Sequence, residues 1–413
     1  MFPILNIGPL AIQAAGFILI LSLFIGLWLT GIFSKNLGTN EDAIENSILF
    51  GLISGLLGAR LGFLLQNPSI FSENPLSFFS LTPSMLNTSF GLFVGLITAI
   101  IYAQKNHLPI WPTLDTLSPL SILIFAGIHL ANLANGENFG LPTNLPWGID
   151  LWNETRHPVQ AYAFILSILT LAGMSIYTIL FRKTGFFRSG ILFSLTMMIF
   201  GLITIITRAF VANKVLLGSF DLWQILGLLV LFLMSFVIYQ KIYRERKHIT
   251  VFLSLGSNQN PLKYLSGGIE KIQKEFKLRL LSSLYITQDV KSGKGSQKFY
   301  NQVAEIDTNI PYPVLRLKLK AIEKDFGREP SNKNVVPLDL DILTFNGDVF
   351  EYEGKKIPDP NLIKYSYVAV PLAEIASGFR HPANGRSIKK ILANINDKDK
   401  IQKVNEVENG LKE

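Results

Sequence analysis

Charge is divided unevenly along this chain, and that division constrains its fold more than any other feature. Of 38 basic and 30 acidic residues in 413, the first 240 positions hold nine of each, which leaves 50 charged residues for the last 173. A globular domain carries charge over most of its surface, so the two parts must face different surroundings. The sequence therefore predicts a membrane domain over 1–245, a soluble domain over 249–393 and a charged tail over 394–413.

The first part contains apolar stretches long enough to cross a bilayer. A hydrocarbon core about 30 Å thick needs about 20 mostly apolar residues per helix. Seven stretches meet this requirement: 14–33, 46–66, 84–104, 116–134, 159–181, 189–211 and 221–240. We expect seven membrane-spanning helices.

Basic residues in the connections predict the orientation of these helices. The loops that follow the first, third, fifth and seventh spans carry nine, namely Lys35, Lys105, Arg182, Lys183, Arg188, Lys241, Arg244, Arg246 and Lys247. The alternate loops carry only Arg156 and Lys214. Short loops rich in Lys and Arg stay in the cytoplasm. We therefore expect the N-terminus outside the cell membrane and the soluble domain in the cytoplasm.

Several polar side chains lie at or near membrane depth, where they are costly and usually face the bundle interior. The candidate lipid-site residues among them are Asn132, Asn135, Glu137, Arg156 and Arg208. They gather at the outer ends of the fourth and sixth spans. Two interpretations stay open: the residues bind a lipid headgroup, or they satisfy one another between the helices of a membrane anchor.

The motifs around these residues resemble the prolipoprotein diacylglyceryl transferase family. The matching strings are Leu57-Gly58-Ala59-Arg60-Leu61-Gly62, Asn135-Gly136-Glu137, Pro142-Thr143-Asn144-Leu145-Pro146-Trp147-Gly148 and Arg156-His157-Pro158-Val159-Gln160-Ala161-Tyr162. The resemblance covers about 1–245. It implies transfer of diacylglycerol from phosphatidylglycerol to a lipoprotein cysteine in a bacterial inner membrane. The family's proposed proton-accepting histidine is missing, since Ser89-Phe90-Gly91 stands there, and His129 replaces one of its arginines.

The second part alternates strand and helix patterns. Strands are predicted at 249–255, 279–287, 300–308 and 338–345, and apolar residues at helical spacing predict helices over 263–277 and 312–326. The order β-α-β-β-α-β is that of a ferredoxin-like α+β domain.

The sharpest chemical feature of the second part is the segment Pro337-Leu338-Asp339-Leu340-Asp341-Ile342-Leu343. Residues i and i+2 share one face of a strand, so Asp339 and Asp341 point the same way. Two neighbouring carboxylates repel each other unless a cation lies between them, and oxygen ligands suit Mg²⁺ shared with a phosphate chain. The alternative is an exposed strand face with two solvated aspartates.

The second part also resembles 6-hydroxymethyl-7,8-dihydropterin pyrophosphokinase over about 250–393. The matching strings are Ser254-Leu255-Gly256-Ser257-Asn258, Ser282-Ser283-Leu284-Tyr285, Phe299-Tyr300-Asn301, Gly327-Arg328, Leu338–Leu343, Ile357-Pro358-Asp359-Pro360, Val370–Ala376 and His381-Pro382. The resemblance implies transfer of pyrophosphate from ATP to the pterin hydroxymethyl group in folate biosynthesis. This chain has a shorter loop before the aspartate strand, Asp359 in the place of the usual histidine and Tyr365 in the place of an arginine.

The resemblance also assigns roles to residues. It implies that Asp339 and Asp341 are catalytic and hold two Mg²⁺ ions. The pterin-binding residues it implies are Thr287, Phe299, Asn301 and Tyr367. The ATP-binding residues it implies are Glu323, Arg328, Lys333 and Lys364.

These features leave three hypotheses of function. The first is a membrane-tethered pterin pyrophosphokinase whose N-terminal half binds lipid or is a relic transferase. The second is a bifunctional enzyme in which both halves turn over, and the third is a non-catalytic lipid- and nucleotide-binding membrane protein. A nucleic-acid partner has no support, because the basic residues form no stripe with interleaved aromatics. The oligomeric state stays open, and the absence of Cys excludes disulfides and thiolate sites.

Overall fold

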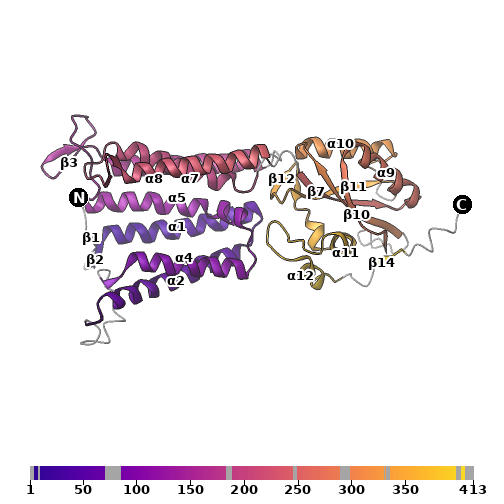
Figure 1. The fold of residues 1–413 in the computed structure, drawn as a ribbon, viewed down its shortest axis with the longest axis horizontal. Coiled ribbons are helices and arrows are strands. Elements are labelled where there is room, and N and C mark those ends of the chain that lie inside the picture. The colour runs from indigo at the N-terminus through magenta and orange to yellow at the C-terminus, as the bar shows by residue number, and fades with distance from the viewer. Residues whose placement is uncertain are drawn as a thin grey trace.

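The computed structural model describes residues 4–7, 10–69, 85–182, 188–244, 249–288, 298–329, 331, 335–396 and 401–404. Within these ranges, seven helices are long and apolar enough to cross a membrane, as predicted. They are α1 (Ala14–Leu37), α2 (Glu41–Gln66), α4 (Thr88–Lys105), α5 (Ile110–Asn135), α6 (Val159–Arg182), α7 (Ile191–Arg208) and α8 (Leu222–Tyr239). Figure 1 shows them side by side as one bundle, with the sheet domain at one end.

Small residues allow the membrane helices to approach closely. A Cβ added at Gly91 of α4 would stand 2.7 Å from the backbone oxygen of Gly55 in α2, and one at Gly95 would stand 2.7 Å from that of Gly51. In lipid, where apolar surface gains little by association, such backbone approach is a main source of helix packing. Thus α2 and α4 form one tight pair, while α1 packs chiefly on α5.

Three short hairpins lie at the end of the bundle away from the sheet domain, where Figure 1 labels β1, β2 and β3. They are β1–β2 (Ile4–Ile7 and Leu10–Gln13), β3–β4 (Ile149–Leu151 and Glu154–Arg156) and β5–β6 (Leu216–Leu217 and Phe220–Asp221). The second and third flank the predicted lipid-site residues.

The second part is an α+β domain, which confirms the predicted fold class. Its main elements are β7 (Ile249–Ser257), α9 (Pro261–Glu275), β8 (Lys277–Leu281), β9 (Tyr285–Gln288), β10 (Lys298–Thr308), α10 (Tyr312–Asp325) and β11 (Asp339–Phe345). After β11 come β12 (Phe350–Tyr352), β13 (Lys355–Ile357), the 3-10 turn η5 (Pro360–Ile363), α11 (Ser366–Ile375), α12 (Ile388–Ala393) and β14 (Ile401–Lys403).

The main sheet is antiparallel, with the strand order β11-β7-β10-β9-β14 and β8 also paired to β10. This order is compatible with the ferredoxin-like arrangement, which stays a prediction in its details. The strand expected over 279–287 is two strands, β8 and β9, because at Ser282 the side-chain hydroxyl, in the place of a backbone oxygen, accepts the backbone N–H of Val303. Part of the segment expected as a charged tail pairs with β9 as β14.

Helices cover both faces of this sheet. On one face, Leu265 and Ile272 of α9 and Leu315 of α10 pack against buried strand residues. On the other face, Val368 and Leu372 of α11 join a second buried cluster with residues of β10, β11 and α12. Asn301 of β10 and the two aspartates of β11 alternate with the residues that face α9 and α10, so they lie on the α11 face.

The two parts of the chain touch at the end of the bundle nearest the sheet domain. The carboxylate of Asp348, which follows β11, accepts the backbone N–H of Ser189 just before α7, at 3.2 Å. Gly385 lies against the backbone of His107, between α4 and α5. The short π-helical segment η3 (Gln240–Arg244) continues α8 toward the sheet domain.

Candidate functional site

The candidate site of the soluble domain is built on one row of paired residues across three strands. Asn301 of β10 pairs with Gly256 of β7, and Gly256 pairs in turn with Asp339 of β11. A Cβ at Gly256 would be 3.7 Å from the side-chain oxygen of Asn301 and 4.0 Å from Cβ of Asp339. Because Gly256 has no side chain, the space between the amide of Asn301 and the carboxylate of Asp339 is open. A ligand can approach the sheet there.

The two aspartates predicted from the sequence share one face of β11. Leu338, Leu340 and Ile342 are 0%, 2% and 7% exposed, whereas Asp339 and Asp341 are only partly buried. The alternation therefore sends the apolar side chains into the core and the carboxylates toward the site.

A third carboxylate, from Asp359, lines the same pocket as Asp341. It is 7% exposed and accepts the backbone N–H of Asn361 at 2.7 Å, which fixes its direction. Within the described part of the chain, no three His, Cys, Asp or Glu side chains converge as a complete metal site. Mg²⁺ is commonly held by one or two carboxylates together with substrate phosphates, so this donor set fits that ion.

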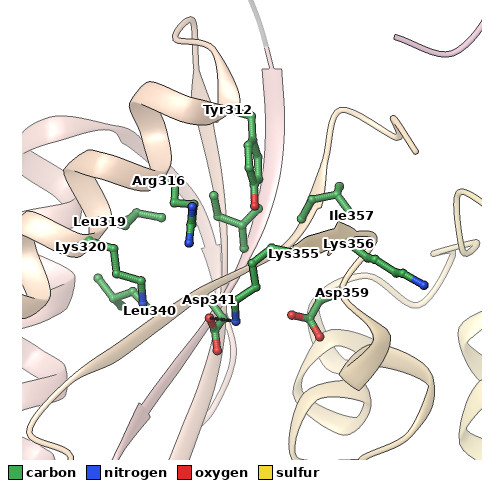
Figure 2. A pocket seen from close by; sticks show the side chains of 11 residues that line it. Tyr312, Arg316, Leu319, Lys320, Leu340, Asp341, Lys355, Lys356, Ile357 and Asp359 are labelled. Atoms are coloured by element: carbon green, nitrogen blue, oxygen red, sulfur yellow. Dashed lines mark ion pairs between the residues drawn. The ribbon is translucent and has the colours of Figure 1, made fainter. Parts of the chain in front are cut away.

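The pocket beside Asp341 is lined by cations, as Figure 2 shows. They are Arg316 and Lys320 of α10 and Lys355 and Lys356 of β13. The ammonium of Lys355 reaches over Asp341, at 4.0 Å from a carboxylate oxygen. With a cavity volume of about 20 Å³, the pocket can hold an ion or a water molecule but not a purine ring.

The predicted pterin residues lie on two adjacent strands and on α11. The side-chain amide of Asn301 donates to the Thr287 hydroxyl at 3.0 Å and to the backbone oxygen of Phe299 at 3.3 Å. Asn301 and Thr287 are 4% and 3% exposed. These bonds occupy the side-chain N–H groups of Asn301. Its side-chain carbonyl oxygen is left to face the open space above Gly256.

Tyr367 of α11 lies near the three aspartates of the site. Burial raises the pKa of its hydroxyl, and the carboxylates of Asp341, Asp359 and Asp339 raise it further. The phenol therefore stays protonated near the carboxylates. Tyr365 stacks on Tyr367, with ring centroids 5.4 Å apart and an interplanar angle of 23°. Tyr365 thus supports the ring that the sequence predicts to sandwich the pterin.

Glu323 of α10 connects that helix to the aspartate strand. One carboxylate oxygen accepts the backbone N–H of Leu340 at 2.7 Å, and both oxygens accept from Lys320, at 2.7 and 2.9 Å. Burial raises the pKa of Glu323, and Lys320 and the Leu340 N–H oppose that rise. Leu340 lies between the two aspartates in β11. By bonding to its backbone, Glu323 of α10 fixes the strand segment that sets their spacing, and it does not line the pocket.

For the pyrophosphoryl transfer that the resemblance implies, we expect Glu323→Ala to lower kcat far more than it changes the KM for ATP. The change leaves the buried N–H of Leu340 without an acceptor, which costs about 1–3 kcal/mol of stability. Glu323→Gln retains an acceptor oxygen and should restore most of the kcat. Steady-state kinetics of the two variants test this, and equal losses for Ala and Gln would contradict the positioning role.

Arg328 and Lys364, two other predicted ATP residues, are not among the residues that line this pocket. The guanidinium of Arg328 donates to the backbone oxygens of Glu329 and Val335, at 3.1 and 3.5 Å. Lys364 is exposed and caps η5. Lys333 lies outside the described residues. The sequence reasoning missed Arg316, Lys320, Lys355 and Lys356, whose one available signal was positive charge next to the elements that frame β11.

The membrane domain has its own cavity of about 290 Å³ at the ends of α5, α6 and α7 that lie away from the sheet domain. Arg208, His129 and Gln160 are among the polar residues that line it. Gln160 is 1% exposed and donates to the backbone oxygen of Glu137 at 2.6 Å, while its own side-chain oxygen has no hydrogen-bond partner among the residues that the structure describes. Of the five predicted lipid-site residues, Arg208 is the one that lines this cavity.

Arg208 is already engaged by a carboxylate. Its guanidinium donates to both oxygens of Asp221, at 2.6 to 3.2 Å, and the side chain of Asp221 is 1% exposed. Asp221 also accepts the backbone N–H groups of Trp223 and Gln224 at the start of α8. The pair therefore ties α7 to α8 and neutralises the one arginine of the cavity.

The remaining predicted lipid-site residues serve the loops outside the cavity. Arg156 pairs with Glu154, donates to the backbone oxygens of Gly140 and Leu151, both at 3.2 Å, and stacks its guanidinium on Phe139 at 4.9 Å. Asn135 donates weakly to Glu137, at 3.4 Å. Asn132 is half-buried on α5 next to them. These contacts match the interpretation in which polar residues satisfy one another.

Comparison with known proteins separates the two parts in the same way. The family model of prolipoprotein diacylglyceryl transferase matches residues 3–240, and that of 7,8-dihydro-6-hydroxymethylpterin-pyrophosphokinase matches residues 252–377. Both resemblances inferred from the sequence are therefore confirmed.

Individual relatives cover only part of the chain. A phosphatidylglycerol–prolipoprotein diacylglyceryl transferase of Thermus thermophilus is 33% identical over 151 residues, which are 36% of this chain and 53% of that protein. One of Aeromonas hydrophila is 28% identical over 173 residues, 40% of this chain and 63% of that protein. The chain thus spans less than two thirds of the length of these relatives. Among solved structures, a Plasmodium falciparum HPPK-DHPS is 15% identical, with a TM-score of 0.31 over 38% of this chain and 47% of that one.

Proposed function

Since this chain belongs to the prolipoprotein diacylglyceryl transferase family and matches a pterin pyrophosphokinase after its membrane part, we propose a membrane-tethered pyrophosphokinase. It moves pyrophosphate from ATP to 6-hydroxymethyl-7,8-dihydropterin, in folate biosynthesis, on the cytoplasmic face of a bacterial inner membrane. The main observation behind this proposal is the row Asn301–Gly256–Asp339. It places an amide and a carboxylate on either side of the open space above a glycine.

Each residue of the row has a defined part in the reaction. The carbonyl of Asn301 accepts a hydrogen bond from an N–H group of the pterin, and the rings of Phe299 and Tyr367 hold its faces. The hydroxymethyl oxygen attacks the β-phosphorus of ATP and loses its proton, and the bond between the β-phosphorus and the oxygen bridging to the α-phosphorus breaks. AMP leaves, and the pterin carries the pyrophosphate.

Asp339 and Asp341 would hold Mg²⁺, two ions in this proposal, with the buried Asp359 beside them. The ions, when bound, neutralise charge on the phosphates and orient them. The protein's own contribution is to hold the carboxylates on one face of β11, through the apolar residues between them and through Glu323 behind them.

The cations of the pocket supply a second part of the phosphate site. Arg316, Lys320, Lys355 and Lys356 stand where a triphosphate bound at Asp341 would pass. They offset the shorter loop before β11. In this proposal Arg328, Lys333 and Lys364 also contact the phosphates of ATP.

We expect Lys355→Gln with Lys356→Gln to raise the KM for ATP about tenfold and to leave the KM for the pterin unchanged. Two partly exposed charge-assisted contacts to phosphate are worth about 0.5–1 kcal/mol each, and 1.4 kcal/mol is tenfold. Lys389→Gln with Lys390→Gln, on α12, is the matched control. A KM for ATP that both double variants leave unchanged would place the triphosphate elsewhere.

For the membrane half we propose lipid binding without diacylglyceryl transfer. The cavity offers the unpartnered oxygen of Gln160 to a hydroxyl of a glycerol headgroup such as that of phosphatidylglycerol. Asp221, however, already neutralises Arg208, and His129 is packed edge-on against Phe125, at 4.7 Å between ring centroids. Diacylglyceryl transfer is the second candidate, favoured by the family match over 3–240.

One assay on the full chain in lipid nanodiscs tests both halves. AMP release from Mg-ATP is measured with and without 6-hydroxymethyl-7,8-dihydropterin, and transfer of labelled diacylglycerol to a lipoprotein peptide is measured in parallel. We expect pterin-dependent AMP and no labelled peptide. Labelled peptide would establish the bifunctional enzyme, and AMP that does not depend on pterin would refute the pyrophosphokinase.

A further inference from the structure

A second, larger cavity lies between α1 and α2, at the end of the bundle nearest the sheet domain. Its volume is about 520 Å³. Phe24 and Trp28 of α1 and Leu52 of α2 form its apolar wall and are 67%, 67% and 44% exposed. Because α1 packs chiefly on α5 and α2 packs on α4, the two helices leave a groove that opens sideways. This groove is separate from the cavity that Arg208 lines.

The groove has the length of one lipid leaflet. The residues that line it on α1 run from Phe24 to Lys35, which is about 16 Å at 1.5 Å per residue. Half of a hydrocarbon core about 30 Å thick is nearly the same length. The groove therefore matches a lipid whose tails lie along Phe24 and Trp28 and whose headgroup lies at Lys35.

The polar end of the groove carries charges of both signs. Lys35 stands 3.3 Å from a carboxylate oxygen of Glu41, and its side chain is 73% exposed. The carboxylate of Glu45 also turns toward the groove, since a Cβ at Gly31 would be 3.5 Å from one of its oxygens. Among the described residues, Glu45 makes no ion pair or hydrogen bond. One cation and two carboxylates give this end a net charge of −1.

We propose that this groove binds phosphatidylethanolamine, a phospholipid with a zwitterionic amine-phosphate headgroup. Its phosphate meets Lys35 and its primary ammonium, with three N–H donors, meets Glu45. An anionic headgroup such as phosphatidylglycerol can offer Glu45 only neutral hydroxyl donors, without a positive charge, and is repelled by the net negative charge. A quaternary ammonium headgroup lacks the N–H donors.

Trp28 allows a direct test with the full chain in phosphatidylcholine nanodiscs. Phosphatidylethanolamine or phosphatidylglycerol with brominated tails is included at one small and equal mole fraction. The fluorescence of Trp28 is taken as the difference between the native chain and Trp28→Phe. We expect brominated phosphatidylethanolamine to quench this difference about threefold more than brominated phosphatidylglycerol, the effect of one partly exposed ion pair.

Two variants on the same turn of α2 separate the headgroup contact from general charge. Glu45→Gln should remove the preference, whereas Asp42→Asn, an exposed residue next to the groove lining, should retain it. Equal quenching by both lipids in the native chain overturns the proposal, and so does stronger quenching by phosphatidylglycerol. A preference that survives in Glu45→Gln overturns the assignment of the ammonium to that residue.

Discussion

Replacing both Asp339 and Asp341 with asparagine should lower pterin-dependent AMP formation by at least about 10³-fold, because metal-assisted charge stabilisation contributes several kcal/mol to such reactions. The two side chains share one face of β11 and are backed by buried leucines, so asparagine retains the shape and removes only the charge. The measurement is AMP release from Mg-ATP by the full chain in nanodiscs, with and without the pterin.

The matched control for this pair is Asp325→Asn. Asp325 ends α10 and forms an exposed ion pair with Lys271, at 2.9 Å, so its replacement removes a charge without touching the site. We expect Asp325→Asn to retain native activity. If the Asp339 and Asp341 variant kept activity within about tenfold of the native chain, the metal role of these residues would be wrong.

Much of the fold could be predicted because it depends on the spacing of apolar residues within short stretches of the sequence. The seven apolar runs and the alternation around Asp339 follow from hydropathy and from the strand period. Two features could not be predicted in this way. Ser282 breaks a strand by bonding to Val303, 21 residues away, and Ile401–Lys403 becomes a strand only because the edge of β9 is available.

The candidate site divides in the same manner. Asp339, Asp341 and Asn301 stand in short motifs, so their types and spacing could indicate their role. The cations at the pocket come from α10 and β13, which tertiary packing alone brings together. Glu323 was expected at the nucleotide, but its carboxylate accepts a backbone N–H of β11. That contact depends on the burial of Glu323 against the strand, which residue spacing in the sequence does not reveal.

The ion pair between Arg208 and Asp221 could likewise not be predicted from the sequence. It leads to the second prediction with a large expected effect. We expect Arg208→Met to destabilise the membrane domain by about 3–5 kcal/mol, since it leaves the buried carboxylate of Asp221 without a counter-charge. The effect should appear as a lower Tm of the full chain in detergent. Lys214→Met removes an exposed basic residue of the same loop and should leave the Tm unchanged.

The double variant Arg208→Met with Asp221→Asn distinguishes a structural pair from a lipid site. Asparagine still accepts the N–H groups of Trp223 and Gln224, so the start of α8 stays capped while both charges disappear. If the pair is structural, most of the lost Tm returns in the double variant, and added phosphatidylglycerol stabilises it as much as it stabilises the native chain. If Arg208 instead holds a lipid phosphate, the Tm recovers but stabilisation by phosphatidylglycerol is lost, and diacylglyceryl transfer becomes the better reading of the membrane half.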